Sequence, residues 1–292
     1  MQVTFLGTSA SEVVPDPFCR CAGCDAARRE GGRSLRLNSA LLVNDDLIID
    51  LGPCLGAASM KLGIDLAGVR YALQTHAHED HLDALTLGAR RPRGGHPPLA
   101  EMSLLTLHCS QPVMDRIDHI LKLNGRGVTI RDPEVAAGFG LEVVAIAPWQ
   151  EFRAGPYRVQ SVAASHDEGR EAMLFAIEDT RSGGRIFYGT DTGPLAPDTW
   201  LRLAGLGWAF DLFILDHSFG FGAPSTGHLN AEQFLTEVSL ARAAGVIGES
   251  TRVIGTHLAH HSHPAHEETT AWASDRGYDI AWDGWTLPVK PV

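Results

Sequence analysis

The chain of 292 residues lacks any apolar run of about 18 residues or more, the length that a bilayer-spanning helix needs. Its first residues, MQVTFLGTSASEVVPDP, also lack the basic segment and the long apolar stretch of a secretory signal. We therefore expect a cytoplasmic protein that does not enter a membrane.

Positive charge is also scarce. Lys and Arg number 24 against 35 Asp and Glu, so the formal net charge is −11. Long basic runs are missing, and an extended nucleic acid is held mainly by clustered cations on the protein. This composition argues against an extended nucleic-acid partner and is compatible with a small anionic substrate.

Cysteine is rare, and its five residues are an odd number that does not suit a disulfide framework. Three of them, Cys19, Cys21 and Cys24, lie together in CRCAGC. In a cytosolic chain this spacing predicts a structural zinc loop near residues 19–24, which needs a fourth ligand to close its shell. Cys54 and Cys109 are isolated, and we expect both to be buried free thiols.

Histidine, in contrast, is abundant, with 14 residues. The densest cluster is THAHEDH, in which His76 and His78 are two residues apart and point to the same side of an extended segment. Asp80 and His81 follow in a turn. Imidazole and carboxylate ligands suit Zn, Mn or Fe better than Ca or Mg. A solvated polar loop, the alternative interpretation, does not account for so dense a group of ligands.

Apolar strands alternate with helical patterns, and the chain has no internal repeat. The pattern predicts strands at 2–6, 39–43, 47–50, 69–74, 157–164, 185–188, 212–215 and 252–255, and helices at 112–123, 197–206, 231–244 and 264–276. Residues 44–46 have the chemistry of a hairpin turn. Several strands end at a His or Asp. This arrangement predicts a layered α/β sandwich, one domain over residues 1–292, with a site at one edge.

The segment from Thr75 to His81 resembles the signature of the metallo-β-lactamase superfamily, and the resemblance extends over nearly the whole chain. It implies an αβ/βα four-layer sandwich, with two mixed β-sheets flanked by helices and a di-metal site at their mouth. Asp50, in IIDLG, resembles the aspartate that orients the histidine loop. The later ligands follow in the expected order, as His166 in ASHD, Asp191 in YGTDTG and His257 in GTH.

The resemblance implies a separate set of ligands for each of two ions. His76, His78 and His166 hold the first ion, Asp80, His81 and His257 hold the second, and Asp191 bridges the two. Divalent ions about 3.5 to 4 Å apart lower the pKa of a bridging water toward about 7 and stabilise charge on a phosphate. Taken alone, each late ligand is more often a structural or turn residue, but the joint arrangement favours metal binding.

The cysteine loop makes the resemblance more specific, toward the PhnP-like phosphoribosyl cyclic phosphate phosphodiesterases. These enzymes open five-membered cyclic phosphates to a phosphomonoester. The resemblance implies His260 as the fourth zinc ligand, with His261, His263 and His266 as alternatives in the same segment. The zinc would join the N-terminal loop to the segment that carries His257, so its loss should loosen that ligand.

A phosphodiesterase also needs a general acid, because the departing alkoxide must be protonated. His228 in STGHLN is our candidate, since PhnP-like sequences place a catalytic histidine in a comparable Gly-His context. His217 in LDHS is the alternative, and either residue could instead orient its neighbours. Asp80 is expected to help orient the nucleophile.

Two loops are candidates for the substrate side of the site. Arg90, Arg91 and Arg93 follow the histidine motif and could clamp a phosphate, although a solvated loop explains them equally well. The Gly- and Phe-rich segment between Asp216 and His228 is expected to form one wall of the pocket.

These features together predict a metal-dependent phosphodiesterase for a small cyclic phosphate, with two active-site ions (Mn or Zn, or Fe) and one structural Zn. Lactone or thioester hydrolysis is an alternative on the same fold. A tRNase Z-like nuclease is another, against which the lack of a basic exosite counts. A non-catalytic alternative is the PqqB-like group, which shares the cysteine loop but lacks an intact H-x-H-x-D-H. The fold is compatible with a homodimer.

Overall fold

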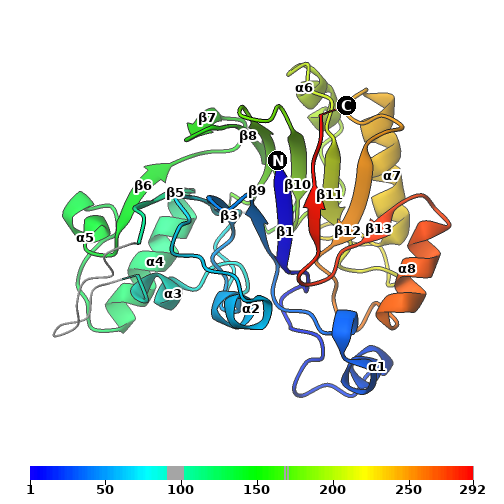
Figure 1. The fold of residues 1–292 in the computed structure, drawn as a ribbon, viewed down its shortest axis with the longest axis horizontal. Helices are drawn as coiled ribbons and strands as arrows, with labels where there is room; N and C mark the ends of the chain where they lie inside the picture. Colours follow the sequence, from blue (N-terminus) through cyan, green and yellow to red (C-terminus); the bar gives the residue numbers. More distant parts are fainter. Residues whose placement is uncertain (91–101, 168, 170, 292) are drawn as a thin grey trace.

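Two seven-stranded β-sheets form the centre of the computed structural model, which describes residues 1–90, 102–167, 169 and 171–291 (Figure 1). The strand orders are β14-β1-β2-β3-β4-β5-β6 and β13-β12-β11-β10-β9-β8-β7. Both sheets mix parallel and antiparallel pairs, and helices flank them. The sandwich expected from the sequence is thereby confirmed, whereas its organisation as one domain stays a prediction.

The first sheet is built mainly from the N-terminal half of the chain. Its strands are β1 (Gln2–Gly7), β2 (Ala40–Val43), β3 (Leu47–Ile49), β4 (Tyr71–Leu73), β5 (Leu105–Cys109), β6 (Leu141–Ala145) and β14 (Thr286–Pro288). The predicted hairpin joins β2 to β3 and places Leu42 opposite Ile48. Strands β3 to β6 are parallel, so their C-terminal ends lie at one edge of the sheet.

The second sheet contains β7 (Glu151–Ala154), β8 (Tyr157–Ala163), β9 (Met173–Asp179), β10 (Arg185–Gly189), β11 (Leu212–Asp216), β12 (Arg252–Thr256) and β13 (Asp279–Ile280). Strands β10 to β13 are parallel. Strand β9 is antiparallel to both β8 and β10, so β8 runs in the same direction as β10. The C-terminal ends of β8, β10, β11 and β12 therefore share one edge.

Helices cover the outer faces of both sheets. They are α2 (Leu55–Leu62), α3 (Ala84–Gly88), α4 (Gln111–Leu123) and α5 (Pro133–Ala137) on the first sheet, and α6 (Thr199–Ala204), α7 (Ala231–Ala243) and α8 (His266–Ser274) on the second. Helix α1 (Ala22–Glu30) lies away from the sheets, at the base of Figure 1, and is followed by the 3-10 turn Gly32–Ser34. Within the described residues, no helix has the length and apolar character to cross a bilayer.

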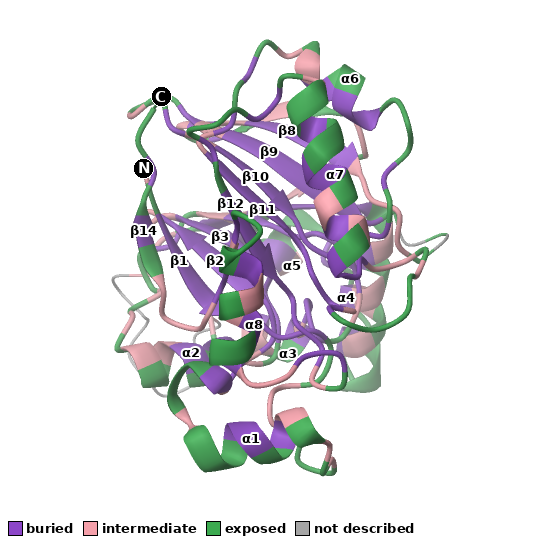
Figure 2. Cartoon of the chain, turned by 90° about the vertical axis from the view of Figure 1, so that its right-hand side faces the viewer, coloured by how far each residue is buried: buried purple, intermediate pink, exposed green. Residues whose placement is uncertain are grey.

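Burial follows these layers, with buried strands inside and helices exposed on their outer faces (Figure 2). Leu41 and Val43 of β2 pack between the two sheets, whereas Leu42 packs toward the helices of the first sheet. Successive side chains of a strand point to opposite faces, and here both faces are covered. This explains why the central strands are continuous apolar runs in the sequence.

Helix α6 offers a direct test of the outer layer. Leu203 is fully buried against the second sheet, and Leu201 on the same helix is 70% exposed. We expect Leu203→Ala to lower the free energy of unfolding by about 2 to 5 kcal/mol, because it leaves a cavity. Leu201→Ala should change it by less than about 0.5 kcal/mol. Denaturant unfolding measures both, and equal effects would contradict this packing.

Candidate metal centre

Loops that follow parallel strand ends bring the candidate ligands together. The histidine loop follows β4 in the first sheet, and the other ligands follow β8, β10 and β12 in the second. The donor atoms form two groups, one of His76, His78, His166 and Asp191, and the other of Asp80, His81, Asp191 and His257. Within each group, all donor atoms lie within 4.8 Å of one another. The structure thus brings together all seven predicted ligands.

The first group centres on the ring of His78. His78 Nδ1 lies 2.8 Å from His76 Nε2 and 3.1 Å from His166 Nε2. Asp191 Oδ2 lies 3.2 Å from His76 Nε2 and 3.5 Å from His166 Nε2. Three imidazole nitrogens and one carboxylate oxygen therefore face a common point, as a four-coordinate ion requires.

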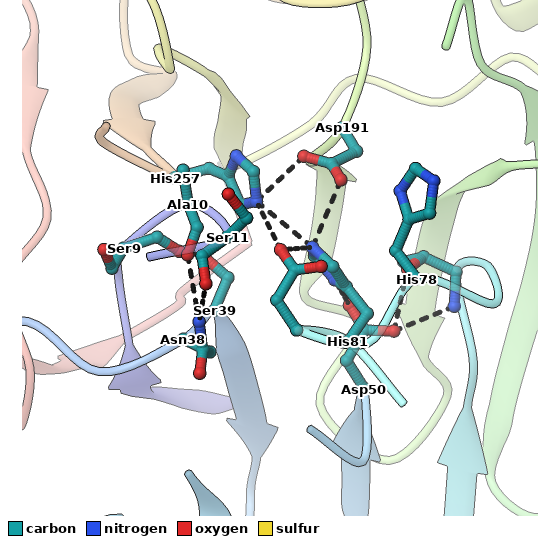
Figure 3. Close-up of polar contacts among 12 residues, drawn as sticks. Ser9, Ala10, Ser11, Asn38, Ser39, Asp50, His78, His81, Asp191 and His257 are labelled. Carbon is teal, nitrogen blue, oxygen red and sulfur yellow. Dashed lines mark hydrogen bonds and ion pairs between the residues drawn. The ribbon is translucent and has the colours of Figure 1, made fainter. Parts of the chain in front are cut away.

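The second group shares Asp191 with the first. His81 Nε2 and His257 Nε2 are 3.1 Å apart, and Asp80 Oδ2 lies 3.2 Å from His81 Nε2. Asp191 Oδ1 is 2.8 Å from His257 Nε2, and Oδ2 is 3.2 Å from His81 Nε2. Figure 3 shows His81 and His257 directed at the carboxylate of Asp191, which lies between them and His78. This placement suits a bridging ligand.

Hydrogen bonds on the opposite side of four rings fix which nitrogen faces the site. Each bond joins Nδ1 to an oxygen: Thr75 Oγ1 for His76 (3.0 Å), Asp50 Oδ2 for His81 (2.7 Å), the Gly227 carbonyl for His166 (3.0 Å) and Ser218 Oγ for His257 (2.7 Å). A proton on Nδ1 leaves Nε2 with a free lone pair. All four histidines are therefore held in the form that binds a metal.

Asp50 anchors the histidine loop, in the place that the resemblance implies. Its Oδ1 accepts from Gln74 Nε2 (3.0 Å) and from both the amide and the hydroxyl of Thr75 (2.9 and 2.8 Å). Gln74 Nε2 also donates to the carbonyls of His76 and His81. Buried hydrogen bonds from Asp50 and Gln74 thus hold the histidine loop in place and orient its ligands.

The donor atoms of each group converge within 4.8 Å of one another, and this arrangement fits cations. With Nδ1 bonded to Ser218, His257 Nε2 can offer its lone pair to a metal, and Asp191 Oδ1, 2.8 Å away, is buried with no hydrogen-bond partner among the described residues. One metal ion in each of the two donor groups would be bound by these nitrogen and oxygen lone pairs. The residues present therefore fit two divalent ions, although their binding stays a prediction.

The electrostatics also indicate concentrated negative charge. Burial opposes charge on His257, but the adjacent Asp191 carboxylate outweighs it and raises the pKa of His257 to about 10. Burial likewise opposes charge on Asp191, yet His257 and His81 hold its pKa well below the usual range. Burial and the neighbouring His81 lower the pKa of His76 to about 4, so His76 is neutral. Cations at this site would be favoured by the same carboxylates.

Three of the site residues have left-handed backbone conformations, with φ of 67° at Asp50, 56° at Asp191 and 63° at His257. Such φ values are unfavourable for residues with side chains and tend to occur at functional sites. Each of the three follows a strand end, where the turn aims the side chain across the edge of the sheet.

Two glycines let the loops approach closely. A Cβ at Gly52 would lie 2.3 Å from the Asp80 carbonyl oxygen, and one at Gly193 would lie 1.9 Å from the Thr226 carbonyl oxygen. Only glycine fits such contacts. They hold the histidine loop against the segment after β3, and the segment after Asp191 against the loop that leads to His228.

The two ligand groups open into a pocket of about 310 Å³. Besides the ligands, its walls are formed by Ala10, Ser11, Glu12, Ser218, Phe219, His228, Ala259 and His261. Asn38 Nδ2 donates to the carbonyls of Ala10 and Ser11 and fixes that wall (Figure 3). Phe219 contributes the wall expected of the Gly- and Phe-rich segment. A pocket of this volume admits a small substrate.

His228 and His217 have different surroundings. His228 lines the pocket, and its Nδ1 lies 3.2 Å from Asp216 Oδ2. Burial opposes charge on His228, but the hydrogen bond and charge of Asp216 raise its pKa. His217 is fully buried and bonded on both nitrogens, to His263 (3.0 Å) and Tyr278 (2.8 Å), and burial lowers its pKa to about 4. The geometry therefore favours His228 as the residue that faces a substrate.

The cysteine loop also forms a donor cluster, with His260. Cys19, Cys21, Cys24 and His260 have donor atoms within 4.8 Å of one another. Burial disfavours the Cys21 thiolate, but hydrogen bonds led by the one to His260 outweigh it and lower the pKa of Cys21 to about 6. Three thiols and one imidazole make up the donor set of a closed structural zinc site.

The alternative histidines are engaged elsewhere. His263 bonds to His217, His261 lines the pocket, and His266 Nδ1 contacts the guanidinium of Arg36 at 2.9 Å. Of the isolated cysteines, Cys109 is buried as expected. The expectation for Cys54 is wrong, because it is only partly buried at the start of α2, where its thiol donates to Asn38.

The arginine clamp receives no support from the described residues. Arg91 and Arg93 lie outside them. Arg90 donates to the Ser103 carbonyl and borders a separate, apolar cavity of about 630 Å³ next to α2 and α3.

The sequence prediction gave no individual role in the site to three residues: Gln74, Asp216 and Ser218. Asp216 ends β11 and accepts from His228, while Ser218 connects it to His257. The sequence feature that could have identified Asp216 is its position at the end of a strand that is parallel to the strands preceding Asp191 and His257.

Comparisons with known proteins agree with this fold. Residues 49–258 match the family described as "Beta-lactamase superfamily domain". Coenzyme PQQ synthesis protein B of Azoarcus sp. (strain BH72) is 23% identical, over 98% of this chain and 99% of that protein. The crystal structure of a diphosphatase from the PhnP family is similar with a TM-score of 0.72 at 21% identity, covering 98% and 96% of the two chains. Zn²⁺-bound PqqB from Methylobacterium extorquens gives 0.70 at 19%, covering 99% and 100%.

The donor clusters predict a metal content that can be measured. The purified chain should hold about three ions, two in the shared site and one in the cysteine cluster. Cys21→Ser should remove about one ion, because the fourth donor needed for a closed zinc shell is lost. Cys54→Ser, a matched control outside the cluster, should remove none. Elemental analysis measures all three proteins, and full retention by Cys21→Ser would show that the structural site is assigned wrongly.

Proposed function

Because this chain belongs to the β-lactamase superfamily, we propose that it is a metal-dependent hydrolase that cleaves a small cyclic phosphodiester. The observation that carries the proposal is the convergence of two donor groups on Asp191, in one pocket that also contains His228. A water attacks phosphorus, one P–O bond breaks, and the departing oxygen takes a proton. Ring opening of a cyclic phosphate in this way gives a phosphomonoester.

The residues at the base of the pocket fit a pair of divalent ions, for which we propose Mn or Zn, or Fe. When bound, two such ions lower the pKa of a water and stabilise negative charge on phosphate oxygens. Asp80, at the pocket floor, has its pKa held below the usual range, because the charge of His81 and contacts to His257 and His81 outweigh its burial. Its carboxylate is therefore ionised and can orient the attacking water.

His228 lies on the wall, where a leaving group can be protonated. Asp216 accepts from Nδ1, which leaves Nε2 as the nitrogen directed to substrate. The raised pKa of His228 keeps a proton available for transfer. Its ring packs between His166 and Phe219, at centroid distances of 4.9 and 5.2 Å. We propose His228 as the general acid.

The PhnP-like subgroup is the finer proposal. It is supported by the cluster of three cysteines and His260, and by the similarity in fold to a diphosphatase of the PhnP family. The pocket of about 310 Å³ and the acidic net charge of −11 favour a small substrate over an extended RNA. Cytoplasmic location and a homodimer remain proposals.

A second candidate is a PqqB-like role in cofactor synthesis, which the similarity over the full length of a PQQ synthesis protein favours. Against it stands the complete set of imidazole and carboxylate donors in this chain, together with His228 on the pocket wall.

A substrate panel tests the proposal. The metal-loaded chain is incubated with bis(p-nitrophenyl) phosphate, ethylene phosphate, a simple lactone and a short RNA. We expect turnover of the two phosphodiesters, and its loss in Asp191→Asn and in chelator-treated protein. Turnover of the lactone alone, or of no substrate with Mn or Zn, would contradict a phosphodiesterase.

The leaving group tests His228 separately. An alkoxide from ethylene phosphate needs a proton, whereas p-nitrophenolate leaves without one. His228→Ala should therefore lower kcat on ethylene phosphate about 100-fold or more, and on bis(p-nitrophenyl) phosphate less than about tenfold. Metal content should stay at the wild-type value. Loss of an ion instead would identify His228 as a ligand.

A further inference from the structure

Asp216 has a fully buried side chain with four hydrogen bonds. Its Oδ1 accepts from the backbone N–H groups of Ser218 (2.9 Å) and Leu229 (3.0 Å). Its Oδ2 accepts from Ser218 Oγ (2.9 Å) and His228 Nδ1 (3.2 Å). An ionised carboxylate has about four acceptor positions. Although Asp216 lies near the donor atoms of Asp191 and His257, its lone pairs are therefore already used.

Ser218 extends this network to the metal centre. Its hydroxyl has one proton, which it donates to Asp216 Oδ2. At 2.7 Å from His257 Nδ1, the same oxygen must therefore accept the proton on that nitrogen. Nε2 of His257, which faces Asp191 and His81, is then the nitrogen available to a metal.

We infer that Asp216 is a positioning residue that fixes two functional histidines at once, His228 directly and His257 through Ser218. The part concerning His228 rests on the proposed function, because it assumes a general acid. The part concerning His257 does not, because it concerns only the affinity of the site for metal. The bond from Leu229 N also fixes the backbone beside His228.

Two substitutions separate these connections. Asp216→Asn keeps one oxygen for the N–H groups of Ser218 and Leu229, but its amide group cannot accept from Ser218 Oγ or His228. Ser218→Ala removes only the connection to His257. Asp179→Asn is a matched control, because Asp179 is also buried and accepts hydrogen bonds from Ser182 and Arg181. Asp179 ends the antiparallel strand β9 and therefore lies at the opposite edge of the sheet from the metal centre.

Zinc titration of the apo chain against a competing chelator is the first measurement. Asp216→Asn and Ser218→Ala should each weaken one active-site zinc by about 10- to 100-fold, as loss of an outer partner of a ligating histidine does. The double variant should be no weaker than Asp216→Asn, because both act through one path. Asp179→Asn should bind zinc like the wild type.

Leaving-group dependence is the second measurement. Asp216→Asn should resemble His228→Ala, with a larger loss on ethylene phosphate than on bis(p-nitrophenyl) phosphate. Ser218→Ala should lower both rates by the same factor. A merely structural role of Asp216 would not produce this difference between substrates.

The inference is overturned if Ser218→Ala binds zinc as tightly as the wild type, or if the two substitutions have additive effects. It is overturned for His228 if an active Asp216→Asn enzyme loses both rates equally. If the wild type hydrolyses no phosphodiester, the proposed function fails, and the zinc titration still decides the connection to His257. Ser218→Ala, which removes one hydroxyl, keeps the test possible if Asp216→Asn does not fold.

Discussion

The architecture of the site depends on the close grouping of imidazole nitrogens and carboxylate oxygens around Asp191. Four imidazoles are held with Nε2 facing inward, and two buried carboxylates lie among them. A buried group of this kind is unfavourable unless positive charge is present. Divalent ions would supply that charge and use all of the donor atoms, so their binding would both stabilise this edge and provide its chemistry.

The two-sheet sandwich brings these ligands together. Parallel strands end at one edge, so residues from β4, β8, β10 and β12 meet there although they are far apart in the sequence. Close contacts at Gly52 and Gly193 and the left-handed φ of Asp50, Asp191 and His257 then aim the side chains. The cysteine cluster connects the loop before α1 to the segment after β12, three residues from His257. Rigid support thus reaches the site from several directions.

The sequence carried much of this information because ligands and strand ends are local features. Apolar runs ending in His166, Asp191 and His257 predicted both the strands and the edge, and the fold class was confirmed. Six strands were not predicted, namely β5, β6, β7, β9, β13 and β14. Partly exposed segments such as β6 and β7, and short ones such as β13 and β14, have weak patterns. Strands β5 and β9 are largely buried, so weak patterning does not explain why they were missed. The connection from Asp216 through Ser218 to His257 depends on tertiary contacts, which the spacing of residues in the sequence does not encode. The partial exposure of Cys54 depends on tertiary contacts in the same way.

An anomalous-diffraction map of crystals of the zinc-loaded protein would show directly whether two ions share the carboxylate of Asp191. We expect two peaks about 3.5 to 4 Å apart, one beside His76, His78 and His166 and the other beside His81 and His257, with the Asp191 carboxylate between them. A single peak at this site, or two peaks that do not share Asp191, would contradict this expectation.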